Sequence, residues 1–305
     1  NQCFSISIKA TYHYHSKDST IRFNEFCEKY VSEIQSRKGV KKAIQRGELL
    51  LNGEKTEGGR WLNEGDCITW VESENKPPKI YPLDLSIIYE DNYIAIIEKP
   101  AGICVSGNQY KTVYNALGHN LIPSTAIDAL PWPLPAHRLD NQTRGLLLIA
   151  KTAGARIKLG HDFECKAIHK IYHALVVGKP EKKGEIKVDI DEKKTQTSYE
   201  LISYTPACKG GYLSLLKLTP HTGRTHQLRI HCAHIGSPIL GDSLYSKEEL
   251  LLKNKGLFLA ATGIRLSHPI IGDHLSFDTA IPEKFCKRMT YEKRRNDHFQ
   301  NSRNS

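Results

Sequence analysis

The sequence predicts an α+β protein in which a small domain precedes a larger one. Three observations predict this class: apolar runs of strand length, helical spacing of apolar residues in a few segments, and one break in composition at SENKPPKI. We therefore expect an N-terminal extension at 1–19, a small domain at 20–72, a linker at 73–80, a large domain at 81–285, and a basic, flexible tail at 286–305.

The small domain is expected to contain two helices followed by a small sheet. Phe23, Phe26 and Tyr30 recur at helical spacing, and VKKAIQRG predicts a second, basic helix that ends at Gly47. The run ELLL, an Asn-Gly turn and LNEGDCITWVE then predict strands. Basic residues gather on the second helix and its approach, namely Arg37, Lys38, Lys41, Lys42 and Arg46. Such a helix either binds a polyanion or is simply a solvated surface.

Strands dominate the expected large domain. LSIIYEDNYIAIIEKPAG predicts two strands and a rigid Lys-Pro-Ala-Gly corner, and GLLLIAK predicts a strand before a helix capped by Thr152. KIYHALVVG alternates as a strand that carries Tyr172, and TSYELISYT and GYLSLLKLTP predict a strand pair. TGRTHQLRIHCAHIG predicts a helix with Leu228 and Cys232 in its apolar stripe, which ends at Gly236.

Composition narrows the function classes. A net charge of +10 over 305 residues favours a polyanionic partner, because Lys and Arg that neutralise phosphates release counterions. No apolar run approaches the roughly 18 residues of a membrane span, and no secretory signal pattern is visible, so we expect a cytoplasmic protein. The eight cysteines form no C-x-x-C pair, which argues against a zinc ribbon or a redox motif.

The segment PAHRLDNQTRGLLLIAKT, residues 135–152, has the most unusual pattern. His137, Arg138 and Asp140 stand directly ahead of the most apolar run of the chain. A solvated turn before a buried strand is the ordinary interpretation of such a pattern. A second charged segment, PHTGRTHQLRIHCAHIGSPILGD, favours a functional interpretation of the first segment.

These two segments together resemble the signature pair of the RluA branch of RNA pseudouridine synthases. EDNYIAIIEKPAG, KIYHALVVG and TQTSYELI agree with further motifs of that family in the same order, from Leu85 to Phe277. The resemblance implies the pseudouridine synthase fold, a mainly antiparallel mixed sheet flanked by helices, and isomerisation of uridine in structured RNA. SRKGVKKAIQRGELLLNG resembles the alpha-L RNA-binding domain of a small-subunit ribosomal protein, so the small domain is expected to be an α/β RNA-binding module.

The resemblance also assigns roles to individual residues. Asp140 is the nucleophile, Arg229 its ion-pair partner, and Tyr172 packs on the target base and is a candidate for removing the proton from carbon 5, unless it is an ordinary core aromatic. Arg138 fills the gap left by the flipped nucleotide or contacts a phosphate, and His137 gives structural support. The remaining residues expected to meet RNA are Lys99, Arg224 and Thr225, with Arg37, Lys41, Lys42 and Arg46 of the small domain.

Two residues depart from the family pattern near the expected site. Arg144 stands where Ser is usual, and Glu98 stands where Asn or Asp usually precedes Lys-Pro. Neither departure removes the nucleophile, the arginine or the tyrosine. Both are expected to affect substrate choice or packing.

Rival functions are less favoured by the residues. A metal hydrolase would use His226, His231 and His234, but positions 226 and 231 lie ~140° apart around a helix and H-E-x-x-H is absent. A non-catalytic RNA-binding protein of the same fold would be expected to lack the catalytic residues. We expect a monomer that needs no metal or cofactor, binds no DNA or membrane, and acts on large-subunit ribosomal RNA, with transfer RNA as the alternative. Attack on carbon 1 of the sugar and on carbon 6 of the base remain equally open.

Overall fold

The computed structural model describes residues 8–15, 20–31, 34, 36–71, 78–246 and 255–303. The chain packs into two compact units, Asn1–Lys76 and Pro77–Ser305, and each unit is described by itself. The division falls within the expected linker at 73–80, of which residues 73–77 lie outside the described residues.

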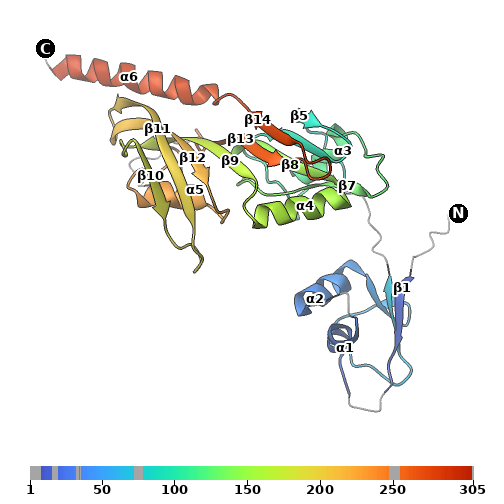
Figure 1. Ribbon diagram of the computed structural model, residues 1–305. Helices are drawn as coiled ribbons and strands as arrows, with labels where there is room; N and C mark the ends of the chain where they lie inside the picture. The colour runs from blue at the N-terminus through green and yellow to red at the C-terminus, as the bar shows by residue number, and fades with distance from the viewer. Residues whose placement is uncertain are drawn as a thin grey trace. The chain divides into compact units, whose positions relative to one another are not determined.

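The first unit has two helices and a four-stranded antiparallel sheet in the order β1-β4-β2-β3 (Figure 1). The Ser36 side chain accepts a hydrogen bond from the Gly39 amide at the start of α2, and the left-handed Gly47, with φ 70°, ends that helix. The elements are β1 (Ile8–His13), α1 (Phe23–Tyr30), α2 (Arg37–Arg46), β2 (Leu49–Leu51), β3 (Glu54–Lys55) and β4 (Cys67–Val71).

One expectation for this unit was wrong. Residues of the expected extension form strand β1, which pairs with β4, and Tyr14 joins the buried core beside Phe26. The extension was expected because this short strand lies ahead of any helical pattern. The strand pairs among the described residues of this unit are all antiparallel, and the two helices and the small sheet agree with the expected small domain.

The second unit is built on a ten-stranded sheet in the order β10-β11-β12-β9-β13-β8-β6-β5, with β14 beside β13 and β7 beside β8. Among the strand pairs formed by the described residues, only β13 and β8 run parallel, which confirms the expected mainly antiparallel mixed sheet. The strands are β5 (Ser86–Glu90), β6 (Ile94–Lys99), β7 (Ala129–Pro135), β8 (Arg144–Thr152), β9 (His169–Val177), β10 (Lys183–Lys187), β11 (Gln196–Ala207), β12 (Gly211–Pro220), β13 (Leu259–Ser267) and β14 (His274–Asp278). The helices are α3 (Val113–Asn120), α4 (Ala153–Glu164), α5 (Gln227–His234) and α6 (Glu283–Arg303).

A glycine makes the parallel junction between β8 and β13 possible. Gly145 adopts φ +130°, and a Cβ atom built on it would lie 2.0 Å from the carbonyl oxygen of Ala261. Only glycine tolerates both this backbone conformation and this close approach. The junction joins the β5–β8 half of the sheet to the β9–β12 half, next to the loop that carries Asp140.

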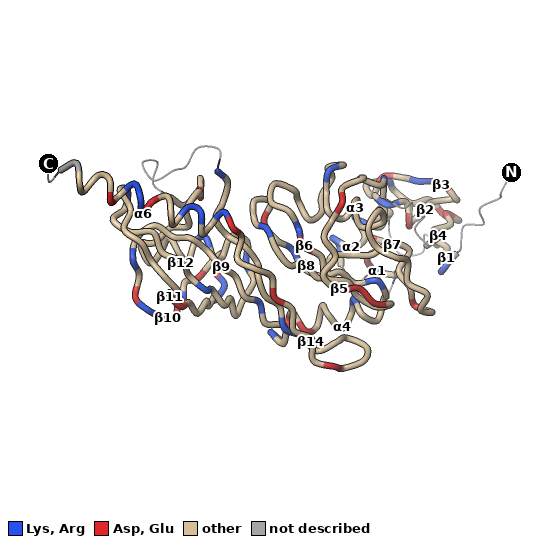
Figure 2. The backbone as a smooth tube through the Cα atoms, turned by 90° about the horizontal axis from the view of Figure 1, so that it is seen from above, with Lys and Arg blue, Asp and Glu red and all other residues tan. Residues whose placement is uncertain are grey.

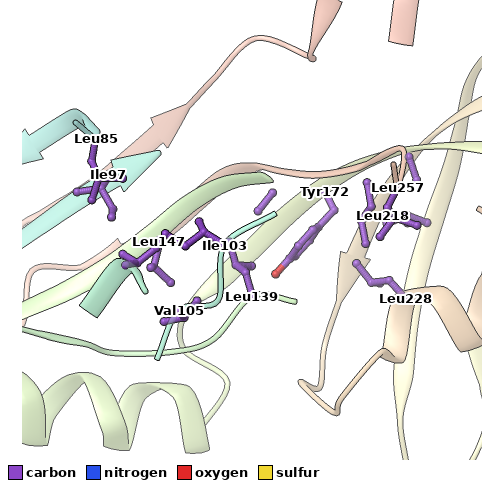
Figure 3. Packing of buried hydrophobic residues seen from close by; sticks show 14 of the residues in the cluster. Leu85, Ile97, Ile103, Val105, Leu139, Leu147, Tyr172, Leu218, Leu228 and Leu257 are labelled. Carbon is purple, nitrogen blue, oxygen red and sulfur yellow. The ribbon is translucent and has the colours of Figure 1, made fainter. Parts of the chain in front are cut away.

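The two faces of β9 belong to different cores. Tyr172 packs in one cluster with Leu139 and Leu228, and Figure 3 shows its ring between these side chains. Leu175 and Val177 point to the other face, into a separate cluster beneath α6. The sheet therefore presents Tyr172 on one face and supports α6 on the other.

The tail expected to be flexible is instead mostly helix α6, which lies along β11 (Figure 1). Phe285 is fully buried, its ring centroid is 5.5 Å from that of Phe258, and Met289 packs one turn later. These two apolar residues at four-residue spacing anchor a segment whose overall composition is basic and polar. Among the described residues, no helix is both long and apolar enough to span a membrane.

Candidate active site

A cavity of about 490 Å³ opens where the loop after β7, the strand β9 and the start of α5 meet. It brings together most of the residues expected from the sequence: Asp140, Tyr172, Arg229, Arg138, His137, Arg224 and Thr225. Arg138, Arg224 and Thr225 are exposed, whereas Tyr172 and Arg229 are buried. The cavity thus has a buried polar floor and a basic rim.

Asp140 lies in the turn between β7 and β8. The amide of Thr143 donates to the carbonyl of Asp140 and closes this turn. The Asp140 carboxylate keeps 18% of its side-chain surface exposed, and its oxygens lie 3.9 Å from both Arg229 Nη1 and His226 Nε2. A carboxylate that is reachable from the cavity and flanked by two nitrogen groups is suited to act on a bound substrate.

Arg229 is held mainly by a residue that the sequence analysis missed. Its Nε and Nη2 atoms each donate a 2.7 Å hydrogen bond to the carboxylate of Asp242, which is fully buried. Burial disfavours the charged carboxylate, but the bonds from Arg229 and from the amides of Leu244 and Tyr245 keep the pKa of Asp242 below its ordinary value. The expected ion pair with Asp140 is therefore only a 3.9 Å approach, and Asp242 fixes the guanidinium.

His226 is a further site residue, and its role differs from the metal ligand considered above. It precedes α5 with a left-handed φ of 56°, an uncommon conformation for a residue other than glycine. Its Nδ1 atom lies 3.0 Å from the hydroxyl of Tyr245. His231, in contrast, is buried and contacts the hydroxyls of Thr195 and Thr197. No cluster of three metal-ligating side chains occurs in the part of the chain that the structure describes.

Tyr172 is placed for packing. Its side chain is 8% exposed, and burial, together with the charge of Asp140, raises the pKa of its phenol. A raised pKa keeps the phenol protonated at neutral pH. This counts against Tyr172 as a proton acceptor in the free protein.

Lys99 does not line the cavity, contrary to expectation. It is fully buried, and its ammonium donates to the carbonyls of Pro100 (2.8 Å) and Asn141 (3.1 Å). Burial lowers the pKa of Lys99 to about 8. Its partner Asn141 is the neighbour of Asp140, so Lys99 anchors the turn that carries Asp140 from within and is not available to RNA.

His137 supports the same loop. Its Nε2 accepts a hydrogen bond from the amide of Leu148, and its ring centroid lies 5.1 Å from that of Phe163. Burial, followed by the charge of Lys170, lowers the pKa of His137 to about 4. A neutral ring with an accepting nitrogen fits the structural role expected from the sequence.

The two departures from the family pattern contact each other. Arg144 Nε, on β8, donates a 2.7 Å hydrogen bond to Glu98 Oε1, on the neighbouring strand β6. The basic residues of α2 belong to the other unit, where Arg37, Lys41 and Lys42 are exposed. Arg46 is paired with Glu48 through two short hydrogen bonds, which reduces its availability to a polyanion.

Comparison with known proteins assigns the chain to the class of enzymes that form pseudouridine in RNA. Residues 93–234 match the family described as RNA pseudouridylate synthase. The chain is also 33% identical, over 82% of its length and 87% of the relative, to an uncharacterized RNA pseudouridine synthase of Aquifex aeolicus. It belongs to the RNA pseudouridylate synthase family and is an RNA pseudouridine synthase, an isomerase.

Other relatives agree with this assignment. The ribosomal large subunit pseudouridine synthase C of Rickettsia conorii is 32% identical over 82% of this chain and 91% of that protein. The synthase D of Haemophilus influenzae is 33% identical over 79% of this chain and 78% of that protein. The solved structure of human RNA pseudouridylate synthase domain containing 4, with a TM-score of 0.53 and 23% identity, covers 66% of this chain and 90% of its own, and shows the same fold.

Proposed function

We propose that this chain converts specific uridines of large-subunit ribosomal RNA into pseudouridine with Asp140 as the nucleophile. The carboxylate of Asp140 at the opening of a basic cavity is the observation that carries the proposal. The substrate follows from the relatives named as ribosomal large subunit synthases, most of whose length this chain covers. Transfer RNA is the alternative substrate, and the assay below compares the two RNAs.

The reaction needs no co-reactant. The bond between sugar carbon 1 and base nitrogen 1 breaks, the base turns, and carbon 1 bonds to base carbon 5. Carbon 5 loses a proton and nitrogen 1 gains one, so atoms and charge balance. Asp140 forms the transient covalent bond, either to the sugar or to carbon 6 of the base, and Arg229 orients its carboxylate from the buried side.

The target nucleotide must leave its helix to reach Asp140, because a stacked base does not expose its glycosidic bond. Arg138, two residues ahead of Asp140, is exposed and lines the cavity, which supports a role in filling the gap or in holding a phosphate. Tyr172 forms an apolar wall against which the flipped base can pack. Arg224 and Thr225, which precede the N-cap of α5, supply rim contacts to the RNA backbone.

The small unit adds RNA affinity in this proposal. The exposed face of α2 carries Arg37, Lys41 and Lys42, and its resemblance to the alpha-L domain supports a phosphate-binding role. Because such contacts are electrostatic, they contribute affinity without selecting the uridine.

The test is Asp140→Asn, assayed by tritium release from transcripts labelled at carbon 5 of uridine. We expect turnover below ~1% of wild type and RNA affinity within about tenfold, because the change removes the nucleophile but few of the phosphate contacts. Asp84→Asn, an exposed carboxylate outside the cavity, is the matched control and should keep wild-type turnover.

Two results would contradict the proposal. If the Asp140→Asn variant kept substantial turnover, Asp140 would not be the nucleophile. If the wild-type protein released tritium from transfer RNA transcripts but not from large-subunit ribosomal RNA, transfer RNA would be the substrate.

A further inference from the structure

A chain of buried hydrogen bonds joins the rim loop of the candidate active site, residues 222–225, to the start of β11. The proposed reaction uses none of its main side chains, which are Gln227, His231, Thr195 and Thr197. Gln227 and His231 lie one turn apart on α5, so both project from the same side of the helix. Arg229, between them in the sequence, reaches Asp140 and Asp242 instead.

The side chain of Gln227 uses all of its hydrogen-bonding capacity. Its Oε1 atom accepts from the hydroxyl of Thr222 at 2.8 Å and from the amide of Arg224 at 3.1 Å. Its Nε2 atom donates to the carbonyl of Gln196 and to the hydroxyl of Thr197, both at 3.1 Å. Because a backbone amide can only donate and a carbonyl can only accept, these partners fix the orientation of the Gln227 amide. Gln227 therefore ties the rim loop to β11.

His231 continues the chain beneath α5. The hydroxyl of Thr195 donates to the carbonyl of Val188, so its oxygen accepts from His231 Nε2, 2.7 Å away. The other ring nitrogen, Nδ1, then accepts from the hydroxyl of Thr197 at 2.9 Å. Burial, followed by the charge of His234, lowers the pKa of His231 and so favours the neutral ring that this arrangement requires. Each hydrogen bond of the chain thus has a defined direction.

The rim loop depends on these bonds for its position. Its sequence, TGRT, contains a glycine and no large apolar side chain, so apolar packing does not fix it. Arg224 and Thr225 are exposed at the cavity, and the loop is held from behind by Gln227. The hydroxyl of Thr222, besides donating to Gln227, accepts from the amide of Gln196 at 3.1 Å. Losing Gln227 would leave the Arg224 amide and the Thr222 hydroxyl without this acceptor.

The charges around β10 and β11 argue for positioning rather than for a direct contact with RNA. Figure 2 shows Lys and Arg positions close to Asp and Glu positions around these strands. Lys187 pairs with Glu185, and Lys194 pairs with Asp189. Opposite charges that lie side by side do not form the basic surface that a phosphate backbone requires.

We propose that Gln227 is a positioning residue that holds the rim loop for contact with the RNA backbone, with His231 and Thr197 holding Gln227 in turn. This inference rests on the proposed function, which gives Arg224 its role in RNA binding. Loss of Gln227 should weaken RNA binding and raise KM. It should change kcat little, because Arg229 keeps its bonds to Asp242.

The first experiment is a double-mutant cycle, measured by filter binding of the full chain to a large-subunit ribosomal RNA transcript. Gln227→Met keeps the length of the side chain and removes its four hydrogen bonds. Gln227→Met and Arg224→Ala should each weaken binding by about fivefold or more, and the double variant should lie within about twofold of the weaker single variant. Arg138→Ala, from the loop after β7, is the comparison, and its effect should multiply with that of Gln227→Met.

The second experiment separates positioning from general stability. Tritium release is measured at a temperature at which every variant is folded, and Gln227→Met should raise KM by about fivefold or more and lower kcat by less than about twofold. Thr197→Val removes one hydroxyl of the chain and should show the same split to a smaller degree, so it is the second variant if Gln227→Met does not fold. Thr262→Val removes a hydroxyl from a similar contact with His173, outside the cavity, and should have wild-type KM.

The outcomes separate this inference from the proposed function. If the effects of Gln227→Met and Arg224→Ala multiply, or if kcat falls while KM is unchanged, Gln227 does not act through the rim loop and the inference is overturned. Equal KM values for Thr197→Val and Thr262→Val would also overturn it. If Arg224→Ala binds RNA like wild type, the inference fails while tritium release can still support the proposed function. A coupled cycle without tritium release by the wild-type protein would retain the inference and reject the proposed function.

Discussion

Asp242→Asn tests whether Asp242, and not Asp140, holds the guanidinium of Arg229 in the position that the proposed mechanism requires. The substitution keeps the size of the side chain and removes its charge. Arg229, 5% exposed, then lacks the carboxylate that receives two of its hydrogen bonds. The freed guanidinium can turn toward Asp140, whose carboxylate is 3.9 Å away, and draw it out of the geometry that meets the substrate.

The size of the effect follows from burial. Removing one partner of a buried ion pair costs about 3–5 kcal/mol of unfolding free energy. For a domain of this size, about 2–4 °C of melting temperature corresponds to each kcal/mol, so we expect melting to fall by about 6–20 °C. Turnover should fall about 10- to 100-fold, because an ångström-scale displacement of a catalytic group has effects of that order.

The pH dependence gives an independent check. The pKa of Asp242 is lower in the folded than in the unfolded protein, so its stabilising effect is complete above the unfolded value of about 3.9 and is lost as pH falls through the folded value. The stability difference between wild type and Asp242→Asn should therefore be constant from about pH 5 to 7. It should shrink below about pH 4.

The assays are thermal unfolding and tritium release at a temperature at which both proteins are folded. A double variant, Arg229→Met with Asp242→Leu, should recover much of the stability but no activity, since apolar residues can replace a buried pair but cannot orient Asp140. Wild-type melting and turnover in Asp242→Asn would refute the reasoning. Activity in the double variant would show that Arg229 is not needed.

Two further predictions concern the fold. Deleting residues 1–78 should leave a folded domain that still modifies RNA, because the chain divides between Lys76 and Pro77. Filter binding should show that this domain binds RNA at least about tenfold more weakly than the full chain. An insoluble fragment, or one with unchanged affinity, would contradict this prediction. Gly145→Ala should lower the unfolding free energy measured in urea by about 2–4 kcal/mol, because its Cβ would meet the Ala261 carbonyl at positive φ. The control Gly160→Ala, in open space on α4, should cost nothing, and equal effects of the two would contradict the close approach at β8 and β13.

Local pattern was sufficient to predict many elements of the fold. The end of α2 at Gly47 and the N-cap of α4 at Thr152 are short-range backbone or hydrogen-bond features that the residue types specify directly. The strand β1 and the helix α6 were not predicted, because both are stabilised by contacts with residues that are far away in the sequence. β1 gains its hydrogen bonds from β4, and α6 gains its burial from Phe258. Tertiary packing overrode a weak local signal in both cases.

The sequence predicted which residues gather at the site better than it predicted the contacts between them. The motifs placed Asp140, Tyr172 and Arg229 at one cavity, as the structure has them. They did not reveal that Asp242 binds Arg229, although GD ends the same motif, because pairing depends on how the loop after α5 folds back. The motifs also led to a wrong position for Lys99. A lysine in the Lys-Pro-Ala-Gly corner was expected to contact RNA, but Lys99 is buried and donates a hydrogen bond to the carbonyl of Asn141, a contact that the local sequence does not indicate.

The contact between Glu98 and Arg144 has a consequence for exchanging segments among relatives. Glu98 is only 19% exposed in its side chain, so it depends on Arg144 more than a fully solvated carboxylate would. A chimaera that receives β8 from a relative with Ser at position 144 would leave this carboxylate without its cation. One that receives β6 instead would leave the arginine unpaired. The strands β6 and β8 should therefore be exchanged together. Chimaeras that receive both strands from one relative should fold and express better than chimaeras that receive either strand alone.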